Sequence, residues 1–218
     1  MRILAFSDIH GSYEIVEEIL SSESEYDLVI LAGDITTCGT PAEMESALRL
    51  FKAHNRPLLG VTGNMDPPAL DETLENAGVS LNGRGVIVAG VGLCGVGASP
   101  LSPLKTPNEI PEEEIMRRAR EGWKSLAGAS WKIFVPHAPP RDTKVDRTFM
   151  GRHVGSASVR LFIEEQEPEI VICGHIHEAR GTDSIGRTKI INCGPSGKGY
   201  YGVVTIGTHP GVELKKWR

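Results

Sequence analysis

The chain has 218 residues, of which 40% are hydrophobic and 23% are charged, proportions that are ordinary for a soluble globular protein. This length supports one sizeable hydrophobic core, so we expect a single domain over residues 1–218. The net charge of −5 argues against a general nucleic-acid binder, and we expect no stable complex with nucleic acid.

No segment indicates an export signal or a membrane anchor. The apolar run at residues 2–6 is too short for a signal peptide, and no stretch approaches the roughly 20 apolar residues that a membrane span needs. The cysteines are far apart and show no CxxC spacing; they are Cys38, Cys94, Cys173 and Cys193. This spacing is typical of reduced thiols, so we expect a cytoplasmic protein without a membrane partner.

The first third of the chain alternates apolar runs with segments of helical periodicity. The strand candidates are 2–6, 27–33 and 56–64, and the helix candidates are 11–22, 41–54 and 66–78. Asp66 occupies the N-cap position of the third helix candidate, directly before Pro67. Repeated strand–helix alternation predicts a parallel sheet.

The rest of the chain predicts both parallel and antiparallel pieces. Glycine interrupts short apolar runs at 79–98, and the NGRG motif there predicts a hairpin. The proline-rich segment 99–111 predicts a surface loop. Further helices are expected at 112–128 and 155–168, and short strands at 187–194, 201–207 and 212–218. We expect a strand that runs into a proline-rich loop at 131–140, and a strand with its exit loop at 169–177.

In five strand candidates, the apolar run stops just before residue types that bind metal ions. These residues are Asp8 and His10, then Asp34, Asn64 and His137, and finally His175 and His177. Taken singly, each motif is weak, because an aspartate after a strand is usually a turn or cap residue. The carboxyl ends of parallel strands share one edge, however, so five distant segments can meet in one crevice. Nitrogen and oxygen donors without thiolate suit Zn, Mn, Fe, Co or Ni.

The ordered set D-x-H, GD, GN-x-D, H-x-P-P and GH-x-H resembles the calcineurin-like metallophosphoesterases from Asp8 to His177. Residues 153–181 are similar to the small Icc-related subgroup of predicted phosphodiesterases, which includes the mammalian metallophosphoesterase-domain proteins. The resemblance implies an α/β fold, a four-layer αββα sandwich of two mixed sheets flanked by helices. It also implies two divalent metal ions, for which we expect Mn, with Fe, Zn, Ni or Co as alternatives.

The family pattern, carried onto the matching positions, implies a set of ligands for each ion. The ligands are Asp8, His10 and His177 for the first ion, Asn64, His137 and His175 for the second, and Asp34 as a bridge between them. The two histidines of the GHIH motif therefore serve different ions. We expect Gly174 of that motif to allow a sharp turn of the backbone beside the ions.

Two ions in such a site lower the pKa of a bridging water and hold a phosphate for in-line attack. We therefore expect a phosphoester hydrolase, in particular a phosphodiesterase, in which a metal-bridging hydroxide attacks a small phosphate ester or nucleotide. The positive charge of the ions is local, so an acidic chain can still bind a phosphate.

One position departs from the family pattern. Many members read GNH, and that histidine is thought to protonate the leaving group, whereas this chain reads GNM with Met65. A thioether donates no proton, and loss of a general acid typically costs about 10²–10⁴-fold on a step that needs it. We assign no other catalytic side chain and expect activity mainly on activated diesters. The alternative is a catalytically weak nucleotide-binding or scaffold protein of the same fold.

Substrate contacts are predicted for Arg141 and His153, outside the metal motifs. Arg141, like Lys144, follows the His137 loop and either reaches a phosphate or is simply solvated. His153 lies in an HVGS segment that resembles a loop near the nucleotide in the related subgroup. Ser156 begins the helix candidate at 155–168, either as an ordinary N-cap or as part of an anion site. Two further histidines, His54 and His209, are expected at the surface, and a homo-oligomer is compatible with the sequence.

Overall fold

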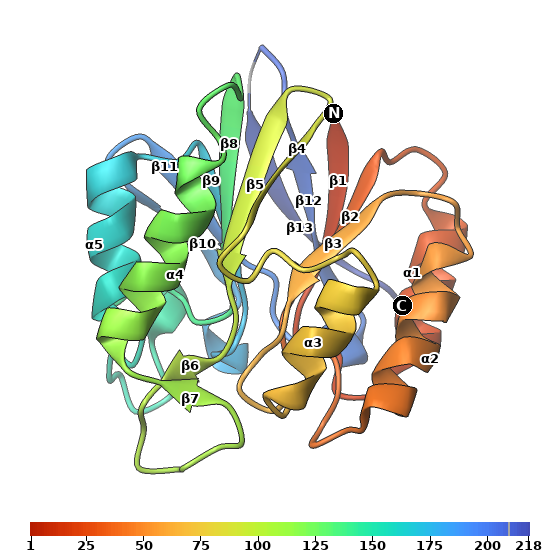
Figure 1. Ribbon diagram of the computed structural model, residues 1–218, viewed down its shortest axis with the longest axis horizontal. Coiled ribbons are helices and arrows are strands. Elements are labelled where there is room, and N and C mark those ends of the chain that lie inside the picture. The colour runs from red at the N-terminus through yellow and green to blue at the C-terminus, as the bar shows by residue number, and fades with distance from the viewer. Residues whose placement is uncertain (209) are drawn as a thin grey trace.

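The computed structural model of this protein describes residues 1–208 and 210–218. His209, for which we expected a surface position, therefore lies outside the described residues. The structure has two large β-sheets that pack face to face, with helices on both outer sides (Figure 1). The predicted four-layer αββα sandwich is confirmed.

The strands of the first sheet are β1 (Arg2–Phe6), β2 (Leu28–Ala32), β3 (Leu58–Val61), β12 (Tyr200–Thr205) and β13 (Gly211–Lys216). Those of the second are β4 (Gly85–Val88), β5 (Val91–Val96), β8 (Trp131–Pro136), β9 (Ile170–Cys173), β10 (Gly181–Ile185) and β11 (Thr188–Asn192). A short separate pair consists of β6 (Ser99–Pro100) and β7 (Glu109–Ile110).

The first sheet is covered by α1 (Tyr13–Ser22), α2 (Pro41–Lys52) and α3 (Ala69–Asn76), on the right of Figure 1. The second sheet is covered by α4 (Glu112–Lys124) and α5 (Ala157–Gln166), on the left. Short 3-10 turns occur at η1 (Lys144–Asp146), η2 (His177–Ala179) and η3 (Ser196–Lys198). Among the described residues, no helix combines the length and the apolar character that crossing a membrane requires.

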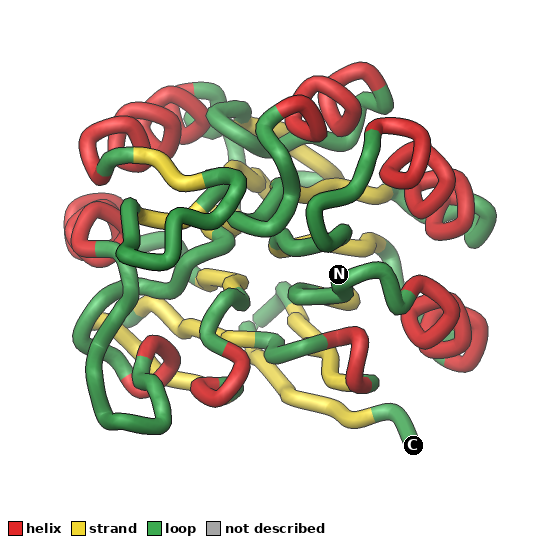
Figure 2. The backbone as a smooth tube through the Cα atoms, turned by 90° about the horizontal axis from the view of Figure 1, so that it is seen from below, coloured by secondary structure: helices red, strands yellow, loops and turns green. Residues whose placement is uncertain are grey.

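The strand order explains how distant segments reach one edge of the molecule. In the first sheet the order is β13-β12-β1-β2-β3, with β1, β2 and β3 parallel to one another. In the second the order is β10-β11-β9-β8-β5-β4, with β5, β8, β9 and β11 parallel. The antiparallel strands β13, β10 and β4 lie at sheet edges. Figure 2 views the molecule from the side on which the parallel strands end.

Both faces of the central strands are buried, which accounts for their continuous apolar sequences. Alternate residues of β1 point to opposite faces: Ile3 contributes to the core between the sheets, whereas Phe6 packs in the core beneath α1 and α2. A third core lies under α4 and α5, where the rings of Phe134 and Phe162 have centroids 4.6 Å apart. The layer between the sheets joins residues from both halves of the chain.

The predicted hairpin at NGRG is wrong, although antiparallel pairing in this region is confirmed. The β4–β5 turn falls at Ala89 and Gly90, which have φ values of 48° and 82°. Positive φ at both central residues is the requirement of a type I′ turn. Asn82 of NGRG precedes β4 and instead bonds to α3 and to the loop after β5: its Nδ2 donates to Asp71 at 2.9 Å, and its Oδ1 accepts from the amide of Gly97 at 3.1 Å.

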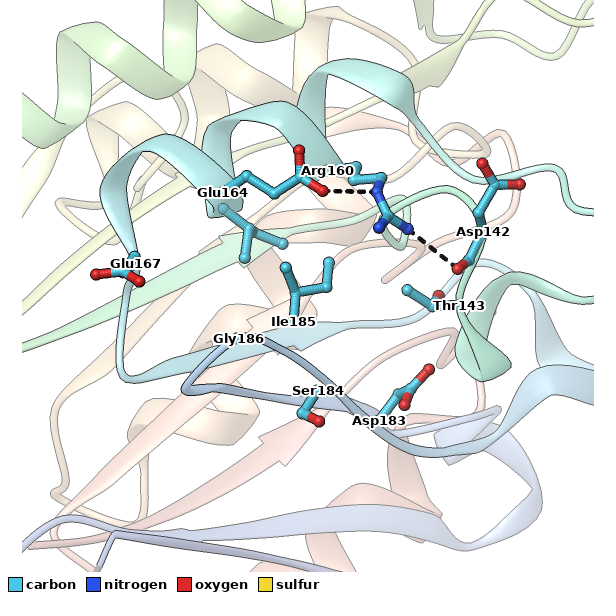
Figure 3. Close-up of a pocket in the computed structure, with 10 residues that line it drawn as sticks. Asp142, Thr143, Arg160, Glu164, Glu167, Asp183, Ser184, Ile185 and Gly186 are labelled. Carbon is cyan, nitrogen blue, oxygen red and sulfur yellow. Dashed lines mark hydrogen bonds and ion pairs between the residues drawn. The ribbon is translucent and has the colours of Figure 1, made fainter.

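A cavity of about 440 Å³ lies between α5 and β10 (Figure 3). The guanidinium of Arg160 on its wall is already paired, with the Glu164 carboxylate at 2.8 Å and the carbonyls of Arg141 and Asp142 at 3.0 and 3.1 Å. Glu167 adds negative charge to the same wall. Among the described residues that line this cavity, no cationic side chain is therefore free to bind a phosphate.

Candidate metal centre

Seven side chains from five loops meet where β1, β2, β3, β8 and β9 end. Six of them form two clusters, in each of which the candidate ligand atoms all lie within 4.8 Å of one another. The first cluster is Asp8, His10 and His177, and the second is Asp34, His137 and His175. The amide of Asn64 joins the second cluster, because its Oδ1 lies 3.0 Å from Nε2 of His137.

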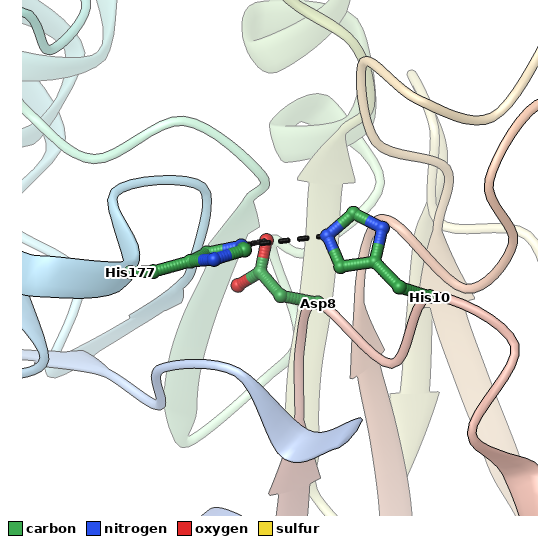
Figure 4. A group of neighbouring side chains, drawn as sticks. All are labelled: Asp8, His10 and His177. Atoms are coloured by element: carbon green, nitrogen blue, oxygen red, sulfur yellow. Dashed lines mark hydrogen bonds and ion pairs between the residues drawn. The ribbon is translucent and has the colours of Figure 1, made fainter. Parts of the chain in front are cut away.

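The first cluster combines the β1 exit loop with the turn after β9 (Figure 4). The Nε2 atom of His177 lies 3.3 Å from Oδ1 of Asp8 and 3.4 Å from Nε2 of His10. The other ring nitrogen of His10 is 3.0 Å from the Thr37 hydroxyl, which orients the imidazole. Two imidazole nitrogens and a carboxylate oxygen thus face one space, a donor set that suits a divalent cation.

Asp34 connects the two clusters. Its Oδ2 lies 3.7 Å from Nε2 of His10 and 3.5 Å from Nε2 of His137. Its Oδ1 accepts a hydrogen bond of 2.7 Å from the backbone amide of Met65, which fixes the carboxylate plane. One oxygen is therefore held by the protein while the other faces histidines of both clusters, the placement that a shared ligand requires.

The second cluster is buried deeper than the first. His137 is fully buried, and its Nδ1 lies 2.8 Å from the carbonyl of Ala32. A carbonyl only accepts, so Nδ1 carries the proton and Nε2 is turned toward Asn64 and Asp34. The ring of His175 packs edge-on against that of His137, with centroids 5.1 Å apart.

The pKa values of the second cluster reflect its burial and its charges. Burial alone would lower the pKa of His137, but the charge and hydrogen bond of Asp34 raise it to about 9. Burial, together with the charge on His137, lowers the pKa of His175 to about 4. Burial would raise the pKa of Asp34, yet His137 and the Met65 amide lower it to about 2. At neutral pH, His175 is neutral and Asp34 is ionised, the forms that bind cations.

Four of the seven residues adopt a left-handed backbone. The φ angles of Asp8, His10, Asp34 and His175 are 52°, 51°, 50° and 69°. Non-glycine residues rarely adopt this region, and each instance costs on the order of 1–3 kcal/mol. Strain concentrated where candidate ligands project into one space is typical of a functional site.

The glycines of the GD, GN and GH motifs make room for side chains from neighbouring loops. A Cβ atom on Gly174 would collide with the Ser7 hydroxyl and the Asp8 carboxylate, and one on Gly63 would collide with Asp34. We expected Gly174 to allow a sharp turn, but its φ is not in the left-handed region. The space left by its missing side chain is what the arrangement requires.

Asp66 is not the N-cap that the sequence predicted, because α3 begins three residues later at Ala69. Its buried carboxylate instead accepts hydrogen bonds from two loops. The donors are the backbone amides of Ile35 (3.0 Å), Thr36 (2.7 Å) and Gly63 (2.8 Å) and the hydroxyl of Thr36 (2.8 Å). Asp66 therefore fixes the β2 exit loop against the β3 exit loop, which carry Asp34 and Asn64.

Sequence reasoning missed two supporting residues. The buried hydroxyl of Ser7 donates to Oδ2 of Asp8 at 2.7 Å, and the amide of His175 lies 3.1 Å from both oxygens of that carboxylate. The side-chain amide of Asn192 donates to the carbonyl of Ile176 at 3.0 Å, which holds the GHIH loop. Serine and asparagine are common in loops, so the sequence carried no signal that separated these two from the rest.

Arg141 and His153 do not line the cavity in front of the clusters. The Arg141 side chain is exposed, and its carbonyl accepts from Arg160 beside the cavity of Figure 3. The Nδ1 atom of His153 lies 2.6 Å from the buried carboxylate of Asp146. A phosphate contact by either side chain stays a prediction.

The N-terminus of α5 is satisfied by protein groups. The Ser156 hydroxyl accepts from the amide of Val159 at 3.0 Å, so the N-cap interpretation of Ser156 is confirmed. The Glu112 carboxylate accepts from the amides of Ala157 and Ser158 at 3.0 and 2.9 Å. A carboxylate of the chain thus occupies the position that an external anion would take.

A cavity of about 520 Å³ opens in front of the two clusters. One wall contains the candidate ligands His10, Asp34, Asn64, His175 and His177 together with Met65. The rest of the lining comes from residues 99–104 and Thr106, from Thr148 and Val154, and from Ile176. Met65, at the position where the family pattern has a proton donor, therefore lines this cavity.

An αββα sandwich whose parallel strands end at two clusters of metal-type ligands defines a protein with the metallo-dependent phosphatase fold. The sequence profile of the calcineurin-like phosphoesterases matches residues 1–179, and this chain belongs to that family. The family typically binds divalent metals and acts on small phosphate esters.

Other proteins are similar to this chain in sequence or in fold. The uncharacterized protein MJ1162 of Methanocaldococcus jannaschii is 32% identical over 205 residues, which cover 92% of this chain and 90% of that protein. The crystal structure of TT1561 of Thermus thermophilus has a TM-score of 0.77 at 18% identity and covers 99% and 98% of the two chains. A dimetal phosphatase from Danio rerio has a TM-score of 0.67 at 11% identity, over 99% and 95%. At these identities, the two solved structures support the fold alone.

Proposed function

We propose that this protein is a phosphodiesterase that depends on two divalent metal ions. The observation that carries the proposal is the Oδ2 atom of Asp34, 3.7 Å from His10 of the first cluster and 3.5 Å from His137 of the second. The proposed ligands are Asp8, His10 and His177 for one ion, Asn64, His137 and His175 for the other, and Asp34 for both. Mn²⁺ is the ion that we propose first, with Fe, Zn, Ni or Co as alternatives.

Bound at these residues, two divalent ions supply a nucleophile derived from water at neutral pH and positive charge for the phosphate. The chain holds the donors in place: Ser7 and the His175 amide fix Asp8, and the Ala32 carbonyl sets the tautomer of His137. The seven proposed ligands include only two carboxylates, so the charge of two divalent ions is not cancelled. An anionic ester is therefore attracted to the site.

Met65 restricts which esters are hydrolysed well. It lines the cavity and offers a thioether, which donates no proton to a departing alkoxide. Esters whose leaving group departs without protonation are the favoured substrates. The proposal therefore predicts faster turnover of aryl diesters than of simple alkyl diesters.

The direct experiment uses purified protein, Mn²⁺ and bis-p-nitrophenyl phosphate. We expect turnover that EDTA abolishes and that added Mn²⁺ restores. The variant His175→Ala should lose at least about 100-fold in rate, whereas Leu161→Ser, an exposed position on α5, should not change it. Turnover that survives both EDTA and His175→Ala would argue for a different site.

A nucleotide-binding or scaffold protein of the same fold is the second candidate, and Met65 is the observation that favours it. The two candidates differ in one measurable respect. Two measurements separate them: the thermal stabilisation of the protein by a nucleotide and metal, and the rate at which the protein hydrolyses the same nucleotide. Tight binding without hydrolysis supports the second candidate, and hydrolysis supports the first.

We also propose that the protein works as one domain in the cytoplasm. All four cysteines are free, and three of them are buried: Cys94, Cys173 and Cys193. Free thiols are the usual state in a reducing compartment.

A further inference from the structure

Most of the exposed large hydrophobic side chains among the described residues lie on two loops beside the two ligand clusters. They are Leu101 (66% exposed), Leu104 (82%), Phe149 (91%), Met150 (79%) and Val154 (41%), whereas the other two are Ile87 and Leu161. We refer to the first five as the apolar collar. Contiguous exposed apolar surface usually marks a binding site in a folded protein.

Three residues of the apolar collar share a cavity with the candidate ligands. Leu101, Leu104 and Val154 line the same cavity as His10 and His175. Phe149 and Met150 lie between Thr148 and Val154, both of which line that cavity. Further apolar lining comes from Met65, Pro100, Pro103 and Ile176. A molecule whose phosphate reaches the clusters therefore contacts apolar surface over much of its remainder.

The first loop of the apolar collar is held in shape by Glu109. Its carboxylate accepts hydrogen bonds from the amide and hydroxyl of Ser102 at 2.9 and 2.7 Å, and from those of Thr106 at 2.8 Å each. Asn108 fixes the loop to the β3 exit loop, because its backbone amide donates to the backbone carbonyl of Asn64 at 3.0 Å. These hydrogen bonds constrain the loop, which carries the exposed side chains of Leu101 and Leu104.

The charges around the cavity limit what the remainder of the ligand carries. Among the described residues that line the cavity, none is lysine or arginine. Lys105, Arg147 and Arg152 belong to the same two loops but are not part of the lining. A bound molecule with several phosphates would need cationic side chains in addition to the metal ions of the two ligand clusters. The cavity thus suits one phosphate group with an uncharged apolar substituent.

We infer that the substrate is an amphiphilic phosphodiester. Its single phosphate binds at the two ligand clusters, and its alkyl or aryl group packs against the apolar collar. This inference rests on the proposed phosphodiesterase function and specifies its substrate class. Met65, at the junction of the clusters and the apolar collar, contacts the apolar group next to the phosphate. The cavity of about 520 Å³ has room for a chain of several carbons.

The test measures binding by calorimetry, with the protein loaded with Mn²⁺ and with methylphosphonate and hexylphosphonate as probes below any micelle concentration. We expect hexylphosphonate to bind at least about tenfold tighter, because each methylene removed from water contributes roughly three- to fourfold. The double variant Leu101→Ser/Leu104→Ser should lose most of this preference. The matched control Leu161→Ser, also an exposed leucine but on α5, should keep it.

Equal affinities for the two phosphonates would overturn the inference, as would an unchanged preference in the folded double variant. Methyl and hexyl p-nitrophenyl phosphate, which share one leaving group, separate this inference from the proposed function. Metal-dependent hydrolysis of both at equal rates contradicts the apolar substrate class alone. A preference for hexylphosphonate without hydrolysis of either ester supports the apolar site and contradicts the hydrolase. Loss of phosphatidylcholine vesicle binding in the double variant, with no hexyl preference, would assign the apolar collar to a lipid surface instead.

Discussion

The Nε2 atoms of His10 and His177 lie 3.4 Å apart, although 167 residues separate them in the chain. The Thr37 hydroxyl lies 3.0 Å from the other ring nitrogen of His10, so Nε2 of His10 is directed toward His177. Oδ1 of Asp8 approaches the same point, 3.3 Å from His177. Two imidazole nitrogens facing each other beside a carboxylate are best satisfied by a shared cation.

Asp34→Asn should weaken binding of both metal ions, because Oδ2 of Asp34 lies close to histidines of both clusters. We expect each affinity to fall by at least about 100-fold, more than the 10- to 100-fold typical of residues that only orient a ligand. His177→Ala should weaken the binding of one ion only. Calorimetric titration with Mn²⁺ distinguishes the two variants; an Asp34→Asn protein that loses a single ion would contradict the bridging role.

Gly174→Ala should displace Asp8, because the added Cβ collides with the Ser7 hydroxyl and the Asp8 carboxylate. We expect the affinity for the first ion to fall by at least about tenfold. Gly128→Ala is the matched control, since a Cβ there meets no atom within 4 Å and its φ is not left-handed. Equal metal affinities in the two variants would show that Asp8 tolerates the added methyl group.

Asp66→Ala should destabilise the fold as well as the site. It leaves three buried backbone amides without their acceptor, those of Ile35, Thr36 and Gly63. At about 1–3 kcal/mol for each unsatisfied group, the loss is on the order of 3 kcal/mol or more. Urea denaturation measures it, with Glu72→Ala, an exposed residue of α3, as the control. A change within about 0.5 kcal/mol, as at an ordinary surface position, would contradict the assigned role.

Metal uptake at neutral pH should release protons. The charge and hydrogen bond of Asp34, acting against burial, raise the pKa of His137 to about 9, so His137 is protonated at pH 7 and must lose its proton to bind an ion. Metal affinity should accordingly increase with pH and level off above about pH 9. The hydrogen bond with Asp8 also raises the pKa of His177, which adds to the release.

Calorimetry at pH 7 in two buffers with different ionisation enthalpies counts these protons. We expect about one proton or more for each chain that fills both sites. His175 should contribute none, because burial, with the charge on His137, lowers its pKa to about 4 and it is already neutral. Heats that do not depend on the buffer would contradict the assignment of His137 as a ligand.

The gathering of the candidate ligands at one edge was easier to predict than the residues that support them. Seven residues at the ends of five apolar runs could be selected because parallel strands place their carboxyl ends at one edge. The role of Asp66 could not be predicted, since an aspartate before Pro67 fits an N-cap equally well and its true partners lie on two other loops.

The fold, too, could be predicted only in part from the sequence. The alternation of strands and helices predicted the layers, but NGRG matched a hairpin turn that the chain makes at Ala89 and Gly90 instead. We did not expect β10, because its sequence GTDSI is polar, as suits the edge strand that it forms. The single domain predicted over residues 1–218 stays a prediction. We predicted a surface loop at 99–111, but the segment also contains the short strands β6 and β7. Its leucines are exposed, and their position beside the clusters depends on Glu109 and Asn108.

The central claim is that seven scattered side chains hold two cations in one cleft. Its most direct test is the metal content of purified protein after saturation with Mn²⁺ and removal of free metal, measured by mass spectrometry. We predict two ions per chain, with no more than one in His175→Ala and two in Leu161→Ser. A wild-type protein that binds fewer than two ions, or a His175→Ala protein that keeps both, would contradict the account.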